Sequence, residues 1–343
     1  MTSECQFMQE HYVDNLPLQV RVSLGTAITL GLQSGKMDAA PTTAYLMTYK
    51  EGKCTANCGF CPQARDSQSR AELLSRVTWP SFPTEQLLEA LGAAAKNGKI
   101  KRVCIQALNY PNVFLHLEAI IKQIKKTTDT PISVSCQPLN SQNILLLKNA
   151  GVDRVGIALD AATETIFNQV KGAAAGGFYN WTSQFSLLEA ALLVFGVGNV
   201  STHLIVGLGE TEKEAVSFIE RCVDMGVLPA LFAFTPVRGT ALEKHPQPEI
   251  ASYRRVQLAR YLLVNGLTCL DCMCFDETGK IVSFGVSTTV LEETVNSGKP
   301  FQTSGCPDCN RPFYNEKPGG PIYNYPKELT VKELEEIKRS LRF

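Results

Sequence analysis

Three cysteines lie close together in the first fifth of this chain, directly after an apolar run. Cys54, Cys58 and Cys61 have the spacing C-x3-C-x2-C and follow the strand-like segment 44–49. Three thiolates at this spacing can hold three irons of a cubane iron–sulfur cluster, because such clusters prefer sulfur ligands. The fourth iron receives no ligand from the motif. The spacing therefore predicts a [4Fe-4S] cluster with one iron open to chemistry.

A structural zinc ion is the competing interpretation of the same motif. Structural zinc needs four closed ligands, and neither histidine nor a fourth cysteine occurs between Cys61 and Lys101. The ligand count therefore favours the cluster. A scaffold or nucleic-acid-binding protein in which all the cysteine groups hold structural zinc is the alternative from another class.

A second group of cysteines occupies the C-terminal third of the chain. Cys272 and Cys274 point to the same face if they lie on a strand, because side chains alternate, and Cys269 then points to the opposite face. Cys306 and Cys309 follow as a C-x2-C pair. We predict that Cys272, Cys274, Cys306 and Cys309 ligate an auxiliary [4Fe-4S] cluster. Zinc at these thiols, and Cys269 in place of Cys272 or Cys274, stay open.

The composition excludes several classes of protein. Lys plus Arg equals Asp plus Glu at 33 each, so no overall field recruits nucleic acid or an anionic membrane. The 12 cysteines are clustered in short motifs, which favours metal in a reducing compartment and predicts a cytoplasmic protein. The N-terminus has no signal-peptide pattern, and no apolar run is long enough to span a membrane.

Strand-like and helix-like segments alternate along the chain. The expected strands are 44–49, 101–108, 131–136, 152–159, 199–206, 230–234 and 267–275, and the expected helices are 84–97, 114–126, 141–150, 182–195, 212–225 and 249–265. This alternation predicts an α/β fold with a parallel sheet, a partial or full (β/α) TIM-type barrel. We expect a helical extension at 1–43, the barrel at 44–275 and a C-terminal extension with auxiliary-cluster ligands at 276–343.

Reactive groups of parallel barrels lie at the carboxyl ends of the strands. The residues at these positions are the Cys54 loop, Gln106, Asn109, Cys136, Asp160, Gly207 and Gly209. A carboxylate such as Asp160 can accept hydrogen bonds from both hydroxyls of a ribose. The two glycines allow the backbone to approach an adenine closely. We expect these residues to line one mouth.

The cysteine motif, with Phe60 before its last cysteine, resembles the cluster motif of the radical S-adenosylmethionine (SAM) superfamily. Residues 101–243 resemble biotin synthase and its relatives, through the segments 103–106 and 205–211 and through Asp160, which matches the ribose-binding Asp of that family. The resemblance implies that SAM binds the open iron. The SAM-binding residues that we predict are Phe60, Gln106, Asn109, Asp160, Gly207 and Gly209.

Two features set the chain apart from biotin synthase, which holds a second cluster inside its barrel with three cysteines and an arginine. Cys104 and Cys136 match two of those cysteines, but Ser201 stands at the third position, so the role of the two thiols stays open. The tail at 306–326 resembles the biotin-synthase-like lipoyl synthases that work as a pair of radical SAM proteins. Single-chain lipoyl synthase carries its auxiliary cysteines before the SAM motif instead.

The resemblance implies a sulfur-inserting enzyme. A 5′-deoxyadenosyl radical takes hydrogen from C6 or C8 of a protein-bound octanoyl chain, and the auxiliary cluster donates sulfide. The implied partners are an octanoylated carrier (a lipoyl domain or glycine cleavage H protein), a second radical SAM subunit and an electron donor such as ferredoxin or flavodoxin. The alternatives are a biotin synthase acting on dethiobiotin and a maturase of a metal cofactor. Candidates for an apolar slot are Tyr110, Phe178, Trp181, Phe232 and Phe234.

Overall fold

The computed structural model describes residues 15–316 and 319–341, so residues 1–14 of the expected N-terminal extension lie outside the described residues. Its centre is an eight-stranded sheet in the order β10-β9-β8-β7-β6-β2-β1-β5. The strands are β1 (Gln19–Val22), β2 (Thr43–Thr48), β5 (Ser81–Pro83), β6 (Arg102–Gln106), β7 (Ile132–Cys136), β8 (Arg154–Ile157), β9 (Val200–Val206) and β10 (Leu228–Ala233).

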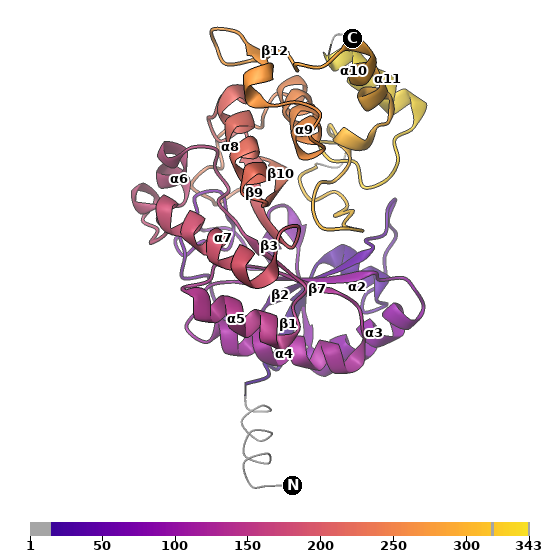
Figure 1. Ribbon diagram of the computed structural model, residues 1–343. Helices are drawn as coiled ribbons and strands as arrows, with labels where there is room; N and C mark the ends of the chain where they lie inside the picture. The colour runs from indigo at the N-terminus through magenta and orange to yellow at the C-terminus, as the bar shows by residue number, and fades with distance from the viewer. Residues whose placement is uncertain (1–14, 317–318, 342–343) are drawn as a thin grey trace.

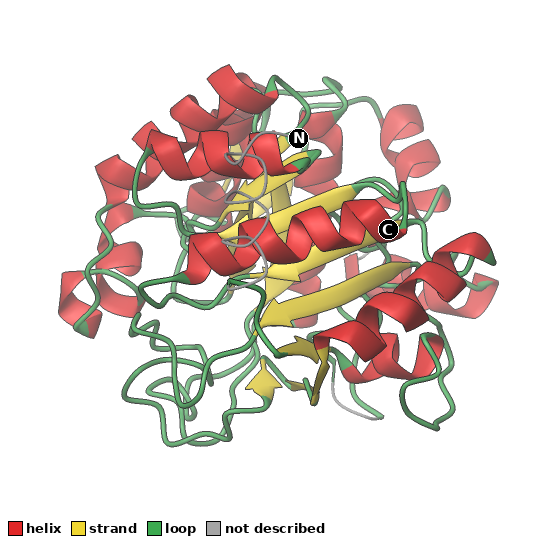
Figure 2. Cartoon of the chain, turned by 90° about the horizontal axis from the view of Figure 1, so that it is seen from below, coloured by secondary structure: helices red, strands yellow, loops and turns green. Residues whose placement is uncertain are grey.

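The helices lie outside this curved sheet (Figure 2). They are α2 (Leu24–Thr29), α3 (Thr84–Lys96), α4 (Val113–Thr127), α5 (Ser141–Ala150), α6 (Glu164–Val170), α7 (Trp181–Phe195), α8 (Glu212–Asp224), α9 (Ile250–Val264), α10 (Thr288–Asn296) and α11 (Val331–Leu341). Figure 1 shows α3, α4 and α5 along one side of the sheet, and α8 and α9 beside β9 and β10. In the ranges described, no helix combines the length and apolarity needed to cross a membrane.

Strands β2 and β6 to β10 are parallel, which confirms the predicted α/β partial barrel. Every residue of β2 is buried, because a parallel strand is covered by helices on one face and by the barrel interior on the other. Parallel pairing also aligns the strand ends, so that Met47 lies opposite Gln106, and Gln106 opposite Ser135. The loops after these strands therefore meet at one mouth.

The N-terminal segment differs from the helical extension expected at 1–43. It forms strand β1, which pairs antiparallel with both β2 and β5, and then the short helix α2. Val20, Val22 and Leu24 are spaced by two residues and fit a strand as well as a helix. The hydrogen-bonded pairing of this segment with β2 favours the strand over the helix. Ser23 then starts α2, because its hydroxyl accepts a hydrogen bond from the Thr26 amide.

The expected seventh barrel strand at 267–275 is wrong. The segment forms a short 3-10 turn, η2 (Leu270–Cys272), and the strand β11 (Cys274–Phe275). Strand β11 pairs only with β12 (Ile281–Ser283), in a separate two-stranded sheet. The backbone leaves the strand path at the turn, where the Leu270 amide donates to the Glu220 carboxylate of α8. The barrel sheet therefore has six parallel strands, and β1 and β5 extend it.

The C-terminal segment returns across the amino-terminal ends of the strands. The Leu231 amide of β10 donates to the Ser304 hydroxyl at 2.8 Å, and the Thr42 amide, just before β2, donates to the Asn310 side chain at 3.0 Å. Arg102 of β6 donates to the Pro307 carbonyl at 3.2 Å. Residues 304–310 thus connect the two sides of the open sheet. They bring the Cys306 and Cys309 pair under the barrel.

Candidate functional site

The loop after β2 holds Cys54, Cys58 and Cys61 in a compact fold of its own. The Cys54 amide donates to the Gln63 carbonyl at 2.9 Å, and the Cys61 amide donates to the Cys58 carbonyl at 3.0 Å. The Gly59 amide donates to the carbonyl of Val170 at the end of α6, at 2.7 Å. As the sequence predicted, the three cysteines are therefore fixed at the carboxyl end of a barrel strand.

A cavity of about 270 Å³ lies inside the barrel, next to this loop. Its wall includes the three cysteines of the loop and four further thiols, those of Cys104, Cys136, Cys306 and Cys309. Phe60, Gln106, Asn109 and Asp160 also line it, as predicted for the SAM site. One chamber therefore contains most of the residues that the sequence singled out, although these come from distant parts of the chain.

The loop cysteines suit a metal cluster. Burial raises the pKa of the Cys61 thiol to about 12 and also raises the pKa of Cys58 above its ordinary value. Such thiols lose their protons when a positively charged metal group compensates their charge. Within the described parts of the chain, no three Cys, His, Asp or Glu side chains converge on a position for a single ion. A cubane cluster is wider than one ion, and three thiols spread along one wall fit it.

Asp160 stands at the end of β8 and carries a buried ion pair. Its Oδ2 accepts a hydrogen bond from Lys171 Nζ at 2.6 Å, and only 1% of the Lys171 side chain is exposed. Lys171 also donates to the Ala158 carbonyl. Asp160 Oδ1 stands 3.9 Å from His203 Nδ1, beyond hydrogen-bonding distance, which leaves this oxygen available to ligand hydroxyls.

Asn109 links the same pair to the cysteine loop. Its backbone amide donates to Cys54 Sγ at 3.1 Å, and its side chain donates to the Tyr179 hydroxyl. The Lys171 ammonium lies 5.1 Å from the centre of the Tyr179 ring. Asn109 and Asp160, both predicted from the sequence, are thus joined through Lys171 and Tyr179, which sequence reasoning missed. No motif identified Lys171, because the residue follows a helix rather than a strand.

Three thiols gather at the opposite end of the cavity. Cys104 lies on β6, and burial together with the neighbouring Cys306 and Cys309 raises its pKa. The hydroxyl of Ser133 lies 3.4 Å from Cys306 Sγ, and the hydroxyl of Tyr45 lies 3.3 Å from Cys309 Sγ. The C-terminal segment therefore inserts its C-x2-C pair among the side chains of β2, β6 and β7. Three thiols, surrounded by hydroxyl donors, form a ligand set typical of an iron–sulfur cluster.

Arg311 completes this end of the cavity. Its guanidinium carbon lies 3.8 Å from the centre of the Phe232 ring, and its backbone amide donates to the Tyr45 hydroxyl. The side chain also donates to the Leu231 carbonyl at 3.2 Å. A positive group therefore sits among the thiols. Its place close behind the C-x2-C pair is a signal that the sequence offered and that we did not use.

The predicted auxiliary ligand set needs a correction. Cys272 is bonded to Cys269, Cys274 is exposed on β11, and none of these three lines the cavity that holds Cys306 and Cys309. The prediction grouped the four thiols because their spacing suited a strand facing a knuckle. The structure instead turns the first segment outward at η2 and carries the second segment beneath the barrel to Cys104.

Polar atoms without partners also face this chamber. Among the described residues, five that line it have a buried side-chain atom without a hydrogen-bond partner: Gln63 Oε1, Trp79 Nε1, Gln137 Oε1, Arg154 Nε and Asn315 Oδ1. An unpaired buried polar atom costs about 1–3 kcal/mol. Five such atoms in residues around one cavity are satisfied most simply by a bound polar ligand.

Other predicted residues lie elsewhere. Gly207 and Gly209 do not line the cavity, and the Gly207 amide donates to the Glu210 carboxylate beside it. The turn is therefore used to cap its own backbone rather than to approach the chamber. Of the aromatic candidates, Phe232 and Phe234 line the cavity, whereas Tyr110, Phe178 and Trp181 do not.

Comparison with known proteins decides the class of this site. Residues 52–222 match the family described as the radical SAM superfamily. The chain carries a radical SAM domain. The match begins just before Cys54 and ends within α8, so it includes the cysteine loop and Asp160. A [4Fe-4S] cluster and SAM are the cofactors of this superfamily, and the buried thiols of the loop fit that cluster.

Several curated relatives of this chain are biotin synthases. The enzyme of Bordetella avium is 26% identical over 223 residues, which cover 63% of this chain and 64% of that enzyme. The enzyme of Cupriavidus pinatubonensis is 27% identical over 275 residues, 74% of each chain. The chain thus spans just under two thirds of the length of the Bordetella relative. The [FeFe]-hydrogenase maturase HydG is similar in fold, with a TM-score of 0.51 at 14% identity over 66% of this chain and 50% of that one.

Proposed function

We propose that this radical SAM protein inserts sulfur into a protein-bound octanoyl chain, as one of two cooperating lipoyl synthase subunits. One observation carries the proposal. The same cavity is lined by two groups of neighbouring thiols, Cys54, Cys58 and Cys61 in one and Cys104, Cys306 and Cys309 in the other. An enzyme that activates a C–H bond and then adds sulfur needs the two kinds of site within reach of one substrate carbon, because a displacement of about 1 Å can cost ~100-fold in rate.

The chain's own residues would bind and orient the reactants. When bound, a [4Fe-4S] cluster on the Cys54 loop with SAM on its open iron supplies an organic radical that abstracts hydrogen. Lys171 offers a buried positive charge for a ligand carboxylate, and Asp160 Oδ1 offers an acceptor for ribose hydroxyls. Asn109, hydrogen-bonded to Cys54 Sγ, holds the loop against the barrel.

The sulfur donor in this proposal is an auxiliary cluster on Cys104, Cys306 and Cys309. The donor set fits because three thiols, two hydroxyls and the Arg311 guanidinium meet at one end of the cavity. Hydrogen bonds to cluster sulfur and ligand thiolates tune such sites. Cys136 of β7 also lines the cavity and is a further candidate ligand for this cluster.

The substrate slot would be apolar in its middle. Phe232 of β10 packs against Tyr314 of the C-terminal segment, with ring centroids 5.8 Å apart, and both line the same cavity as the two groups of thiols. The His203 ring is tilted against Phe232, with ring centroids 4.8 Å apart, and burial lowers the pKa of His203 to about 4, so the imidazole is neutral at pH 7. The aromatic rings offer an apolar surface for an acyl chain, beside the Arg311 guanidinium that lies 3.8 Å from the Phe232 ring.

The carrier and the second subunit are proposed partners, as is a flavodoxin-class or ferredoxin-class electron donor. An octanoyl chain bound to a carrier must enter at the mouth beside the cysteine loop. A separate groove beside that loop is lined by three arginines and two carboxylates and includes Cys58; the charged residues are Arg70, Arg76, Arg238, Asp66 and Glu243. The groove is a candidate place for an acidic donor.

The test is mass spectrometry of an octanoyl-lysyl peptide incubated without oxygen with SAM, dithionite and this protein, with and without a second radical SAM subunit. A gain of sulfur on the octanoyl chain is expected. Dethiobiotin is the second substrate, because the curated relatives are biotin synthases. Sulfur gained by dethiobiotin and not by the peptide would replace the proposal with the biotin synthase alternative.

A further inference from the structure

Three cysteines lie outside the radical SAM site. Cys269 and Cys272 form a disulfide across the turn η2, and Cys274 follows on β11. Cys272 and Cys274 are exposed, and Cys269 is half-buried. None of the three lines the barrel cavity. This arrangement is a C-x2-C disulfide on the surface of the protein, with a thiol two residues away.

The turn that carries the disulfide is held by contacts that do not involve sulfur. The Leu270 amide donates to the Glu220 carboxylate of α8, and the Thr268 hydroxyl donates to the Phe284 carbonyl at 2.7 Å. Gly285, with a φ of +67°, lies against the other side of the turn, where a Cβ atom would stand 2.4 Å from the Cys272 carbonyl oxygen. The turn therefore keeps its shape whether or not the sulfurs are bonded.

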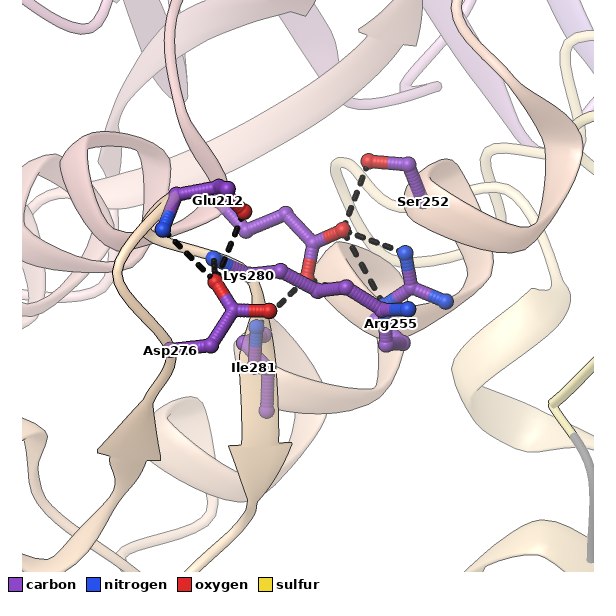
Figure 3. Close-up of polar contacts among 7 residues, drawn as sticks. Glu212, Ser252, Arg255, Asp276, Lys280 and Ile281 are labelled. Carbon is purple, nitrogen blue, oxygen red and sulfur yellow. Dashed lines mark hydrogen bonds and ion pairs between the residues drawn. The ribbon is translucent and has the colours of Figure 1, made fainter.

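The hairpin after the turn is anchored as firmly. Glu212, only 8% exposed, accepts hydrogen bonds from the Ile281 amide of β12 at 2.8 Å and from Arg255 of α9 at 2.6 Å (Figure 3). Ser252 donates to the same carboxylate at 2.8 Å. Asp276 accepts from the Lys280 amide and closes the hairpin loop. Both sides of the disulfide are thus fixed to the outer helices of the barrel.

A structural role explains this disulfide poorly. A disulfide stabilises a protein mainly by closing a loop in the unfolded chain, and the stabilisation grows with loop length. Cys269 and Cys272 are separated by three positions, which is close to the smallest loop that a disulfide can close. The contacts above already hold the same turn. An accessible C-x2-C pair on a rigid support is instead the arrangement that favours exchange with other thiols.

The surroundings indicate what kind of molecule reacts there. Leu267, two residues before Cys269, is 45% exposed, and Val282 of β12 is 61% exposed. Ser283, next to Val282, pairs with Cys274 across the hairpin. One exposed apolar side chain thus lies just before the disulfide in the chain, and another lies on the strand that pairs with β11. A protein surface can cover such a rim, whereas a small hydrophilic thiol such as glutathione gains nothing from it.

We propose that Cys269 and Cys272 form a thiol–disulfide exchange site that reacts with a protein-borne dithiol. A thiolate of the partner attacks the exposed Cys272 Sγ, the Cys269–Cys272 bond breaks, and Cys269 leaves as a thiolate that takes up a proton. The second thiol of the partner then attacks the mixed disulfide and releases Cys272 as a thiol. The partner ends as a disulfide, and two electrons and two protons have passed to this chain.

Two sources supply this chemistry. One is a protein with a C-x2-C dithiol of its own. The other, which rests on the proposed function, is the dithiol acyl chain that two sulfur insertions would leave on the carrier. The exchange site itself does not depend on that function, and it is tested first without any acyl substrate.

The test is alkylation of the oxygen-free holoprotein after equilibration in oxidised or reduced dithiothreitol, followed by mass spectrometry of the tryptic peptide 261–280. In the oxidised buffer one label is expected, on Cys274, and in the reduced buffer three. Cys274→Ser is the matched control and should change from no label to two. Cys269→Ser should trap a mixed disulfide when its Cys272 thiolate attacks the disulfide form of a C-x2-C protein or of a lipoylated carrier and iodoacetamide then blocks the thiol that the partner releases. The arm that traps identifies the source, and trapping in neither arm would contradict the proposal.

Two results would overturn the proposal. One is a peptide with three labels in both buffers, since the pair then does not close. The other is a peptide without labels in either buffer, together with one zinc or additional iron per chain that Cys272→Ser removes. That result would make the three cysteines a metal site. The iron–sulfur absorbance of the barrel serves as the folding control, because none of the three substituted cysteines lines the cavity.

Discussion

Lys171 Nζ donates a hydrogen bond to Asp160 Oδ2 across 2.6 Å inside the barrel, and 1% of the lysine side chain and 9% of the aspartate side chain are exposed. Asp160 adopts a φ of +70°, a conformation that Asp tolerates better than most residues. Buried charges persist in proteins when they are paired. The pair therefore holds a positive and a negative group side by side at the end of β8, where SAM is proposed to bind.

Replacement of Lys171 by Met should leave the Asp160 carboxylate buried without its partner. The loss of one member of a buried pair costs about 3–5 kcal/mol, which urea unfolding under anaerobic conditions can measure. The double variant Lys171→Met with Asp160→Asn should recover most of this stability without recovering SAM cleavage. Lys338→Met, which breaks an exposed pair with Glu335, is the control and should cost less than about 1 kcal/mol. Full SAM cleavage by the double variant would contradict the assigned role.

Substitution of Cys58 should remove the reactive cluster. Cys58→Ala leaves two thiols in the loop after β2, too few to hold a cubane cluster. We expect loss of about four irons per chain and no formation of 5′-deoxyadenosine, measured by iron analysis and chromatography. Cys222→Ala, at a buried thiol of α8 outside the cavity, is the control. Deoxyadenosine formed at the normal rate by Cys58→Ala would refute the assignment of the loop.

Substitutions in the two cysteine groups of the C-terminal third test which thiols ligate the auxiliary cluster. Cys306→Ala and Cys309→Ala should reduce iron from about eight to about four atoms per chain and abolish sulfur transfer, while SAM cleavage continues. Cys104→Ala should behave in the same way. Cys274→Ser should leave the iron content unchanged, since its thiol lies on the exposed hairpin. If Cys274→Ser lost the same irons as Cys306→Ala, the ligand set expected from the sequence would replace the one described here.

His203 makes the stability of the protein depend on pH. Burial lowers its pKa to about 4, and the attraction of Asp160 offsets this only in part. Between about pH 6.5, the ordinary pKa of histidine, and about pH 4, His203 is protonated in the unfolded chain but neutral in the folded protein. The free energy of unfolding should therefore fall as the pH drops, by roughly 2 kcal/mol between pH 7 and pH 5. Urea unfolding of wild type and His203→Gln at both pH values measures it, and an equal decline in both proteins would show that another group is responsible.

Local patterns in the sequence predicted the elements of the barrel well. The strands at 131–136 and 199–206 and the helix at 141–150 lie within one residue of β7, β9 and α5. Gly151 ends α5 with a φ of +102°, as a C-cap glycine does. The C-x3-C-x2-C motif also needed no tertiary information, because all its ligands lie in one loop of eight residues, 54–61. Periodicity and short spacing are local properties, and the chain itself carries them.

The partners of distant residues could not be predicted in the same way. The sequence indicated that Cys306 and Cys309 form a ligand pair, but the path of residues 304–310 beneath the strands decided that they face Cys104 rather than Cys272 and Cys274. Lys171 reaches Asp160 only because α6 turns back over the mouth. The sequence by itself thus determined the parallel barrel and the three cysteines of the radical SAM loop. Only the tertiary structure decided which far thiols share the cavity, because that depends on where packing sends the chain after the last barrel strand.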